Sequence, residues 1–234
     1  RISGIVNHYF DSDMFKFHST SVDRTIISLN SACQGLFPNG TGLINDIANE
    51  PSLDNSITMV PVHTVEQVHD VLLRAYEKCP TIKSRQESYK KSKAYRTLTD
   101  KYMPLLRDIE KWSGIPVSTD LSNFYYTFDY LNTLKVHNLL TLQPVIDNWA
   151  KIEELGMITQ YMFFNRDIQG NLGAGPLVNH ITGVLDTAVN SKHENIAPKY
   201  VHYSAHDTTL QSIFATLNVA NGDSSLQDIP PYGS

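Results

Sequence analysis

Residues 14–36 of the chain read MFKFHSTSVDRTIISLNSACQGL, and this stretch decides the class of fold. Polar and apolar side chains alternate from Met14 to Thr20, which predicts a half-buried strand. From Val22 to Leu36 the apolar residues instead recur every three or four positions, which predicts a helix. A strand that runs directly into a helix is the repeating unit of α/β proteins.

Two other stretches repeat this order of elements. Ile57 to His63 (ITMVPVH) predicts a short strand, and Thr64 with Gln67 three residues later is a capping-box pattern for a helix that continues to about Leu73. Residues 200–205 (YVHYSA) predict a third strand, which runs into a helix over residues 208–217. Repeated strand-to-helix units favour a mostly parallel sheet with helices on both faces.

Between these units the sequence predicts helices only. Apolar spacing indicates helices over 98–112, 122–134 and 144–164, and a further helix over 177–188 follows the break GNLGAGP at 170–176. We therefore expect a three-layer α/β core made of residues 1–75 and 171–234, with a helical cap at residues 76–170 inserted between them. A cluster of rings in this cap is expected to pack in its core rather than to line a substrate entrance; it comprises Phe124, Tyr125, Tyr126, Phe128 and Tyr130.

The overall charge limits the partners that the protein can attract. The 234 residues carry a formal net charge of −5, so no general basic field draws the chain to nucleic acid or to an anionic membrane. No run of about 18 apolar residues is present to form a membrane span. An anionic ligand must therefore be held by a few well-placed cations.

The two cysteines and the start of the chain give further expectations. Cys33 and Cys79 are too few for a disulfide scaffold, and they form no C-x-x-C motif. The chain begins at Arg1 without an initiator Met or a signal peptide, and apolar residues keep helical spacing from Ile2 to Phe10. This opening inside a helix predicts that the sequence is a fragment of a longer protein.

Two strand-to-helix junctions hold the residues best suited to chemistry. In an open parallel sheet, ligands bind at the carboxyl ends of the strands, beside the N-termini of the helices that follow. The first junction, at residues 19–25, carries Arg24, and the last, at residues 204–209, carries His206 and Asp207. We expect these three side chains to share an anion-binding pocket. The alternatives are that Ser21 and Asp207 only cap their helices and that Arg24 forms a surface ion pair.

Other site chemistries lack their sequence motifs. His202 and His206 have the H-x-x-x-H spacing of a helical metal site, but an extended chain places their Cα atoms about 13 Å apart, so we expect no metal there. No G-x-S-x-G, Walker-type or G-x-G-x-x-G motif follows a predicted strand. The residues by themselves therefore predict an oxyanion site and nothing more specific.

Three blocks of the sequence resemble the histidine acid phosphatases, in particular the prostatic and lysosomal type. They are S-T-S-V-D-R-T at 19–25, G-L-F-P at 35–38 and Y-S-A-H-D-T-T-L at 203–210, in the order of the family. The resemblance implies that Arg24 binds phosphate oxygens, that His206 hydrogen-bonds to the phosphoryl group and that Asp207 protonates the leaving alcohol. It also implies a small phosphorylated substrate, no metal or other cofactor, and a secreted or lysosomal location, with which the sequon Asn39-Gly40-Thr41 is compatible.

The chain also departs from the family pattern. The family's R-H-G-x-R-x-P segment, which supplies the nucleophilic His of a phosphohistidine mechanism, is not in this sequence, and His18 stands where close relatives tend to have Arg. The expected activity is hydrolysis of phosphate monoesters, with the nucleophile in a segment beyond this chain. The alternatives are a non-catalytic relative that binds a phosphorylated ligand or a partner, and a phytase or lysophospholipid phosphatase. The sequence leaves open whether the protein forms a homodimer.

Overall fold

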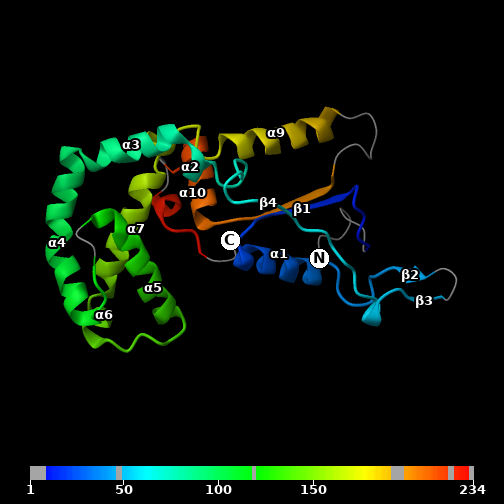
Figure 1. Ribbon diagram of the computed structural model, residues 1–234, viewed down its shortest axis with the longest axis horizontal. Coiled ribbons are helices and arrows are strands. Elements are labelled where there is room, and N and C mark those ends of the chain that lie inside the picture. Colours follow the sequence, from blue (N-terminus) through cyan, green and yellow to red (C-terminus); the bar gives the residue numbers. More distant parts are fainter. Residues whose placement is uncertain (1–8, 46–48, 118–119, 191–197, 221–223, 232–234) are drawn as a thin grey trace. The chain divides into compact units, whose positions relative to one another are not determined.

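The computed structural model describes residues 9–45, 49–117, 120–190, 198–220 and 224–231 (Figure 1). The chain divides into two compact units. The first, here called the sheet unit, consists of residues 1–78 and 174–209, and the second, the helical unit, of residues 79–173 and 210–234. The division expected from the sequence differs mainly in placing 210–234 with the sheet, and the assignment of domains stays a prediction. The expected opening helix falls largely on residues 1–8, outside the described residues.

The sheet unit is built on three parallel strands in the order β4-β1-β5. These are β1 (Phe15–Thr20), β4 (His63–Val65) and β5 (Tyr200–Ser204). Ser19 in the central strand pairs with Thr64 on one side and with Ser204 on the other. A separate antiparallel pair, β2 (Ile44–Asn45) with β3 (Glu50–Pro51), precedes the short helix η1 (Asp54–Ser56).

Helices cover both faces of this sheet (Figure 1). Helix α1 (Asp23–Leu36) packs Leu29 and Cys33 against Phe15 and Phe17 of β1. Side chains alternate along a strand, so His18 points to the opposite face, where it stacks on Tyr203 of β5. Helix α9 (Gly175–Asn190) lies on that second face, where the ring of His180 meets Tyr203 edge-on. The predicted α/β class, with a parallel sheet between helices, is confirmed.

The helix predicted after Thr64 does not form. Strand β4 covers only His63–Val65, residues 66–74 follow as turns, and α2 is confined to Ala75–Lys78. The valines expected on the buried face, Val65, Val68 and Val71, are exposed, so no packing would stabilise a helix there. The Asp70 carboxylate instead accepts a hydrogen bond from the Leu73 backbone N–H at 2.8 Å, which favours a turn.

The helical unit contains the helices that the sequence predicts, with one interruption. It contains α3 (Pro80–Lys90), α4 (Lys93–Ser113), η2 (Leu121–Asn123), α5 (Phe124–Val136), α6 (Gln143–Asp147), α7 (Trp149–Phe164), α8 (Arg166–Gln169) and η3 (Ser224–Gln227). The helix expected over 144–164 is two helices that meet at Asn148. Helix α10 (Asp207–Leu217) begins in the sheet unit and ends in the helical unit.

The rings of α5 divide between the core and the surface. Phe124 and Phe128 are buried in a cluster with Ile152 and Leu155 of α7, as expected for core packing. Tyr126 and Tyr130 lie on the outer side of the helix, 73% and 54% exposed, so the core interpretation is wrong for these two. A helix buries only one stripe of its surface, and the other side of α5 faces solvent.

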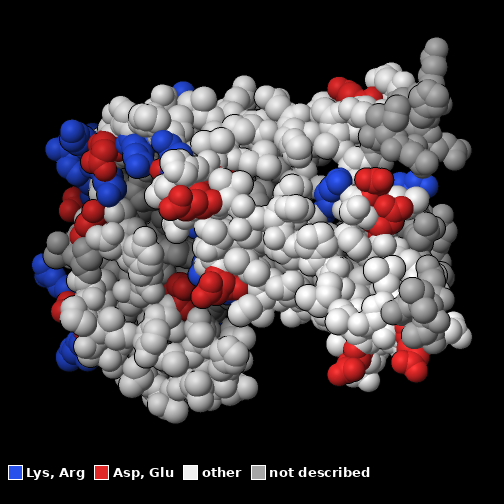
Figure 2. Space-filling view, turned by 45° about the vertical axis from the view of Figure 1, so that its right-hand side comes forward, with Lys and Arg blue, Asp and Glu red and all other residues white. Residues whose placement is uncertain are grey.

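Charge is unevenly distributed over the helical unit. Lys and Arg side chains gather over α3 and α4 (Figure 2); the exposed ones include Lys83, Arg85, Lys91, Lys93 and Arg96. Acidic side chains are interspersed with them. No helix among the described residues has the length and apolar character needed to cross a bilayer.

Gly156 allows α5 and α7 to approach closely, and we expect its replacement by Ala to destabilise the helical unit. A Cβ atom at this position would lie 2.3 Å from the nearest ring atom of Phe128, a buried residue that has little room to move. Gly156→Ala should therefore lower the free energy of unfolding by about 1–3 kcal/mol in chemical denaturation.

The matched control is Gly183→Ala in α9. A Cβ atom there meets no other atom within 4 Å. Alanine is the better helix former, so this variant should be stabilised by up to about 1 kcal/mol. Equal effects of the two substitutions would contradict the close approach of α5 and α7.

Candidate functional site

The candidate site lies in the sheet unit, where β1 and β5 end side by side. Ser19 and Ser204 are register partners near the carboxyl ends of these strands, and α1 and α10 begin a few residues later. This topology brings Arg24 and His206 together: Arg24 Nη2 lies 3.4 Å from His206 Nδ1. Two of the three residues that the sequence predicts to share a pocket are thus in contact.

A network of buried hydroxyl groups supports this contact. Thr20 Oγ1 lies 3.0 Å from His206 Nε2 and 2.7 Å from Thr25 Oγ1. Ser19 Oγ donates to Thr25 Oγ1, and Ser204 Oγ donates to the Thr25 carbonyl at 2.8 Å. Because Ser19, Thr20 and Thr25 are almost completely buried, the network fixes the start of α1 against the end of β5.

The two contacts of His206 define its protonation. An arginine is always a hydrogen-bond donor, so the contact with Arg24 requires an unprotonated Nδ1 on His206. The proton of the neutral ring is then on Nε2, which donates a hydrogen bond to Thr20 Oγ1. Burial lowers the pKa of His206 below its usual 6.5, and the positive charges of Arg74 and Arg24 lower it further. The carboxylates of Asp207 and Glu77 act in the opposite direction. Burial and the two arginines therefore favour a neutral imidazole.

The capping alternatives have different outcomes. The N-cap of α1 is Val22 and makes no side-chain cap bond, so the interpretation of Ser21 as a cap is wrong. Asp207 begins α10 and accepts a local hydrogen bond from the Thr208 backbone N–H at 2.8 Å. Within the part of the chain that the structure describes, Arg24 forms no ion pair and instead contacts His206. An uncapped helix start beside a guanidinium is a suitable place for an anion.

Sequence reasoning missed Arg74 and Glu77, which lie near His206. Thr209 Oγ1 donates to the Leu73 carbonyl at 3.1 Å, and Thr208 Oγ1 donates to Tyr76 Oη at 2.9 Å, so residues 73–77 are held against the start of α10. No motif marked this segment, because the sequence pattern predicted a helix that ended just before it. Only the tertiary hydrogen bonds reveal its position.

His202 is not part of the site. Its ring lies beside Phe17, and Tyr200 Oη is 3.1 Å from its Nδ1. Among the described residues, no group of three His, Cys, Asp or Glu side chains has the arrangement of a metal site. His202 thus belongs to the packing of the α1 face of the sheet.

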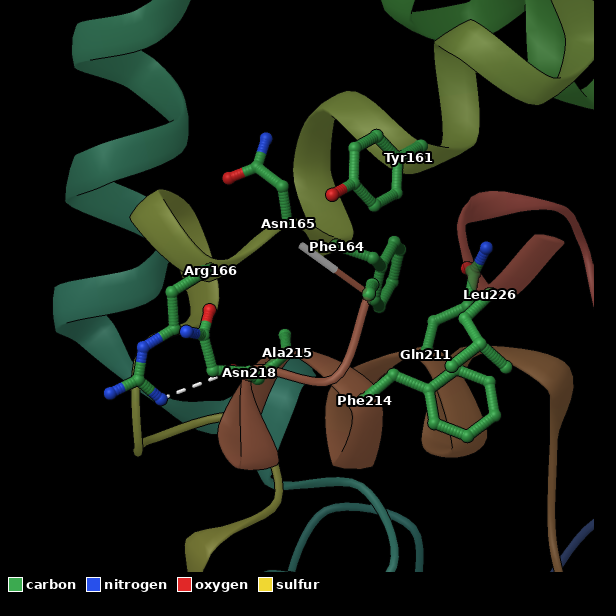
Figure 3. Close-up of a pocket in the computed structure, with 10 residues that line it drawn as sticks. Tyr161, Phe164, Asn165, Arg166, Gln211, Phe214, Ala215, Asn218 and Leu226 are labelled. Carbon is green, nitrogen blue, oxygen red and sulfur yellow. Dashed lines mark hydrogen bonds between the residues drawn. The ribbon is translucent and has the colours of Figure 1, made fainter. Parts of the chain in front are cut away.

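The pocket shown in Figure 3 lies in the helical unit and is a structural feature. It encloses only about 10 Å³, which is room for about a single water molecule. Arg166 at its edge donates to the carbonyls of Ala215 and Thr216, at 3.1 and 2.7 Å. These are among the last carbonyls of α10, so Arg166 caps the end of that helix.

We expect the sheet unit to lose stability as the pH falls through about 6.5, because three of its histidines are held neutral. Burial lowers the pKa of His18, and His63, His180 and Lys16 lower it further; burial is also the main cause for His202 and His206. When the folded-state pKa lies below 6.5, the unfolded chain binds more protons, so stability is lost between 6.5 and the lower folded value. The melting temperature should therefore be lower at pH 5 than at pH 7.5.

His18→Gln should reduce this pH dependence, because it removes one of the three groups. His69→Gln is the control, since His69 is largely exposed and contacts only Glu66 among the described ion pairs. If the melting temperature of His18→Gln depended on pH as strongly as that of the unchanged chain, His18 would not contribute to the pH dependence.

Comparison with known proteins shows the family to which the chain belongs. Residues 4–234 match the histidine phosphatase superfamily (branch 2). The chain is 27% identical over 241 residues to a lysosomal acid phosphatase of Xenopus laevis, and this alignment covers 100% of the chain and 52% of that protein. It is 26% identical to prostatic acid phosphatases of Bos taurus and Homo sapiens, again over 100% of the chain and over 58% of each relative.

The chain therefore spans a little over half the length of these curated relatives. The match to the family is nearly complete along the chain itself. The motif blocks around Arg24 and His206 lie within the matched region, at the carboxyl ends of adjacent strands. The protein belongs to the histidine phosphatase superfamily, branch 2.

Proposed function

We propose that the protein is an acid phosphatase that hydrolyses phosphate monoesters through a phosphohistidine intermediate. The observation that carries this proposal is the contact between Arg24 and His206 at the carboxyl ends of β1 and β5, supported by Thr20. A guanidinium, an imidazole and an uncapped helix start converge there, and all three are suited to a phosphoryl group. The acid phosphatase relatives point to the same reaction.

Each of the three residues has a separate task in this mechanism. Arg24 binds phosphoryl oxygens, and it leaves Nδ1 of His206 when it turns to the phosphate. His206 then takes up a proton at Nδ1 and donates this new N–H to a phosphoryl oxygen, while Nε2 continues to donate to Thr20. Asp207, at the first position of α10, donates a proton to the leaving alcohol.

The nucleophile in this proposal is a histidine of an R-H-G segment outside these 234 residues. Its ring nitrogen forms a bond to phosphorus while the bond from phosphorus to the alcohol oxygen breaks, and the alcohol leaves with the proton of Asp207. A water oxygen then attacks the phosphorus while the bond between phosphorus and the histidine nitrogen breaks, Asp207 takes up a proton from the water, and phosphate is released. In the described sheet β5 is an edge strand, so its outer backbone groups are available to a further strand beside His206.

Turnover of an aryl phosphate tests the proposal. The 234-residue chain should not hydrolyse para-nitrophenyl phosphate, whereas a protein extended upstream through an R-H-G segment should hydrolyse it at mildly acidic pH. Activity of residues 1–234 alone, free of contaminating phosphatase, would contradict the phosphohistidine mechanism.

The relatives suggest a lysosomal or secreted location for such an enzyme, and localisation of a tagged full-length protein checks this.

A second candidate function follows from the missing R-H-G segment. If the encoded protein also lacks it, the same site would bind a phosphorylated ligand without hydrolysing it. Binding of inorganic phosphate by a protein that shows no turnover with or without upstream sequence would favour this candidate.

A further inference from the structure

A short segment of the sheet unit is fixed against the turn that carries His206. The Thr209 hydroxyl accepts from the His206 backbone N–H at 3.3 Å and donates to the Leu73 carbonyl at 3.1 Å. Three residues after Leu73, Tyr76 accepts a hydrogen bond from the Thr208 hydroxyl. Leu73, Tyr76 and Thr209 are all buried, so the position of the segment relative to His206 is well determined.

Arg74 lies within this segment and is itself buried, with 8% of its surface exposed. Its guanidinium donates two hydrogen bonds to Glu77, from Nε to Oε2 at 3.1 Å and from Nη2 to Oε1. A two-point contact of this kind fixes the plane and the direction of the guanidinium. A buried arginine needs such a partner, because burial of an unpaired charge is costly.

The positive charge of Arg74 shifts the pKa of the His206 imidazole. After burial, Arg74 is the strongest influence that lowers the pKa of this imidazole, ahead of Arg24, which touches it. The other charged groups that act on His206 are Asp207 on α10 and Glu77 on α2, and both raise its pKa. Two arginines, Arg24 in α1 and Arg74 just before α2, therefore place positive charge around one imidazole.

We propose that Arg74 is a positioning residue of the phosphate site, held by Glu77 so that a second fixed positive charge lies beside His206. This inference rests on the proposed function of the site. A phosphate monoester is a dianion near neutral pH, and Arg24 alone supplies a single charge. Arg74 adds attraction for the dianion without leaving Glu77, because Coulomb interactions act through several ångströms of a partly buried site.

The pairing with Glu77 gives this role a signature that a purely structural role lacks. Removing the positive charge of Arg74 and removing the negative charge of Glu77 should change phosphate binding in opposite directions. Gln at position 77 keeps an oxygen that accepts a hydrogen bond from Arg74, so Glu77→Gln removes mainly charge. Loss of folding would instead weaken binding in both variants.

The experiment measures inorganic phosphate binding by calorimetry and the titration of the His206 imidazole by ¹⁵N NMR, on the 234-residue chain. Arg74→Gln should weaken phosphate binding by about five- to tenfold, about 1 to 1.4 kcal/mol, and should raise the pKa of His206. Glu77→Gln should tighten binding and lower that pKa. Lys78→Gln, the control, removes a positive charge from α2, the helix that carries Glu77. Lys78 is not among the groups that shift the pKa of His206, so this variant should change binding by less than about twofold.

The possible results separate this proposal from the proposed function. If Arg24→Ala abolishes phosphate binding while Arg74→Gln changes neither the affinity nor the His206 titration, Arg74 is only structural and the inference is overturned. If the unchanged chain and Arg24→Ala bind phosphate equally, the site itself is wrongly assigned. If Arg74→Gln does not fold, Glu77→Gln decides: tighter phosphate binding supports the proposal, and unchanged or weaker binding overturns it.

Discussion

Asp207→Asn should slow the hydrolysis of an alkyl phosphate by about 10²- to 10⁴-fold, the usual contribution of a general acid. An alkoxide is a poor leaving group and needs the proton that Asp207 is proposed to donate. Para-nitrophenolate leaves without a proton, so the same variant should be much less impaired with para-nitrophenyl phosphate. The measurement is kcat/KM for both substrates in a protein that includes the R-H-G segment.

His206→Ala is the matched comparison for this prediction. The His206 side chain is proposed to donate a hydrogen bond to the phosphoryl group, which is common to both substrates. His206→Ala should therefore lower kcat/KM by a similar factor for the alkyl and the aryl phosphate. A burst experiment must first show that phosphoryl transfer limits the rate. If hydrolysis of the phosphoenzyme were slower, the measured rate would not depend on the leaving group. If transfer is limiting and Asp207→Asn slows both substrates equally, Asp207 only orients the start of α10.

Arg24→Ala should reduce kcat by about 10²- to 10³-fold, the usual effect of removing one preorganised donor to a developing charge. Arg24 contacts His206 and has no ion-pair partner within the described ranges of the chain, so its guanidinium is free to turn toward phosphate. Inhibition by inorganic phosphate should weaken in parallel, because product and transition state share the phosphoryl oxygens.

Arg24→Lys tests whether charge alone is sufficient. A lysine keeps the charge but lacks the planar pair of donors that matches two phosphate oxygens, so this variant should also be impaired, though less than Arg24→Ala. Wild-type rates and wild-type phosphate inhibition in Arg24→Ala would show that Arg24 is a surface residue without a role in the reaction.

The sequence predicts the elements of this protein well where local periodicity and tertiary packing agree. Phe15, Phe17, Leu29 and Cys33 mark β1 and α1 by spacing alone, and the structure buries these four residues together. The prediction fails at 64–73, where the apolar spacing of a helix is present but no surface covers the valines. It fails in the same way at Tyr126 and Tyr130, because an aromatic side chain does not reveal which side of a helix is covered.

The residues of the candidate site also differ in whether the sequence could predict them. Arg24, His206 and Asp207 could be selected from the sequence because each lies at a junction where a strand is followed by a helix. Arg74 could not, because nothing in its local pattern indicates that Leu73 and Tyr76 bind the start of α10. Its nearness to His206 depends on hydrogen bonds between segments more than 130 residues apart, at separations of 132 and 136.

The sequence by itself determined the strand-to-helix junctions at 15–36 and 200–217 and the helical stretches at 98–112, 122–134 and 144–164, and it supplied the residue types of the proposed oxyanion site. Short-range spacing and the chemistry of single side chains are properties of a local stretch, so they can be read without a fold. Only the tertiary structure decided that β1 and β5 are neighbours, which brings Arg24 into contact with His206 across 182 residues of chain. Pairing of distant strands depends on hydrogen bonds and packing that form only when the whole unit folds, and the sequence of neither strand contains that information.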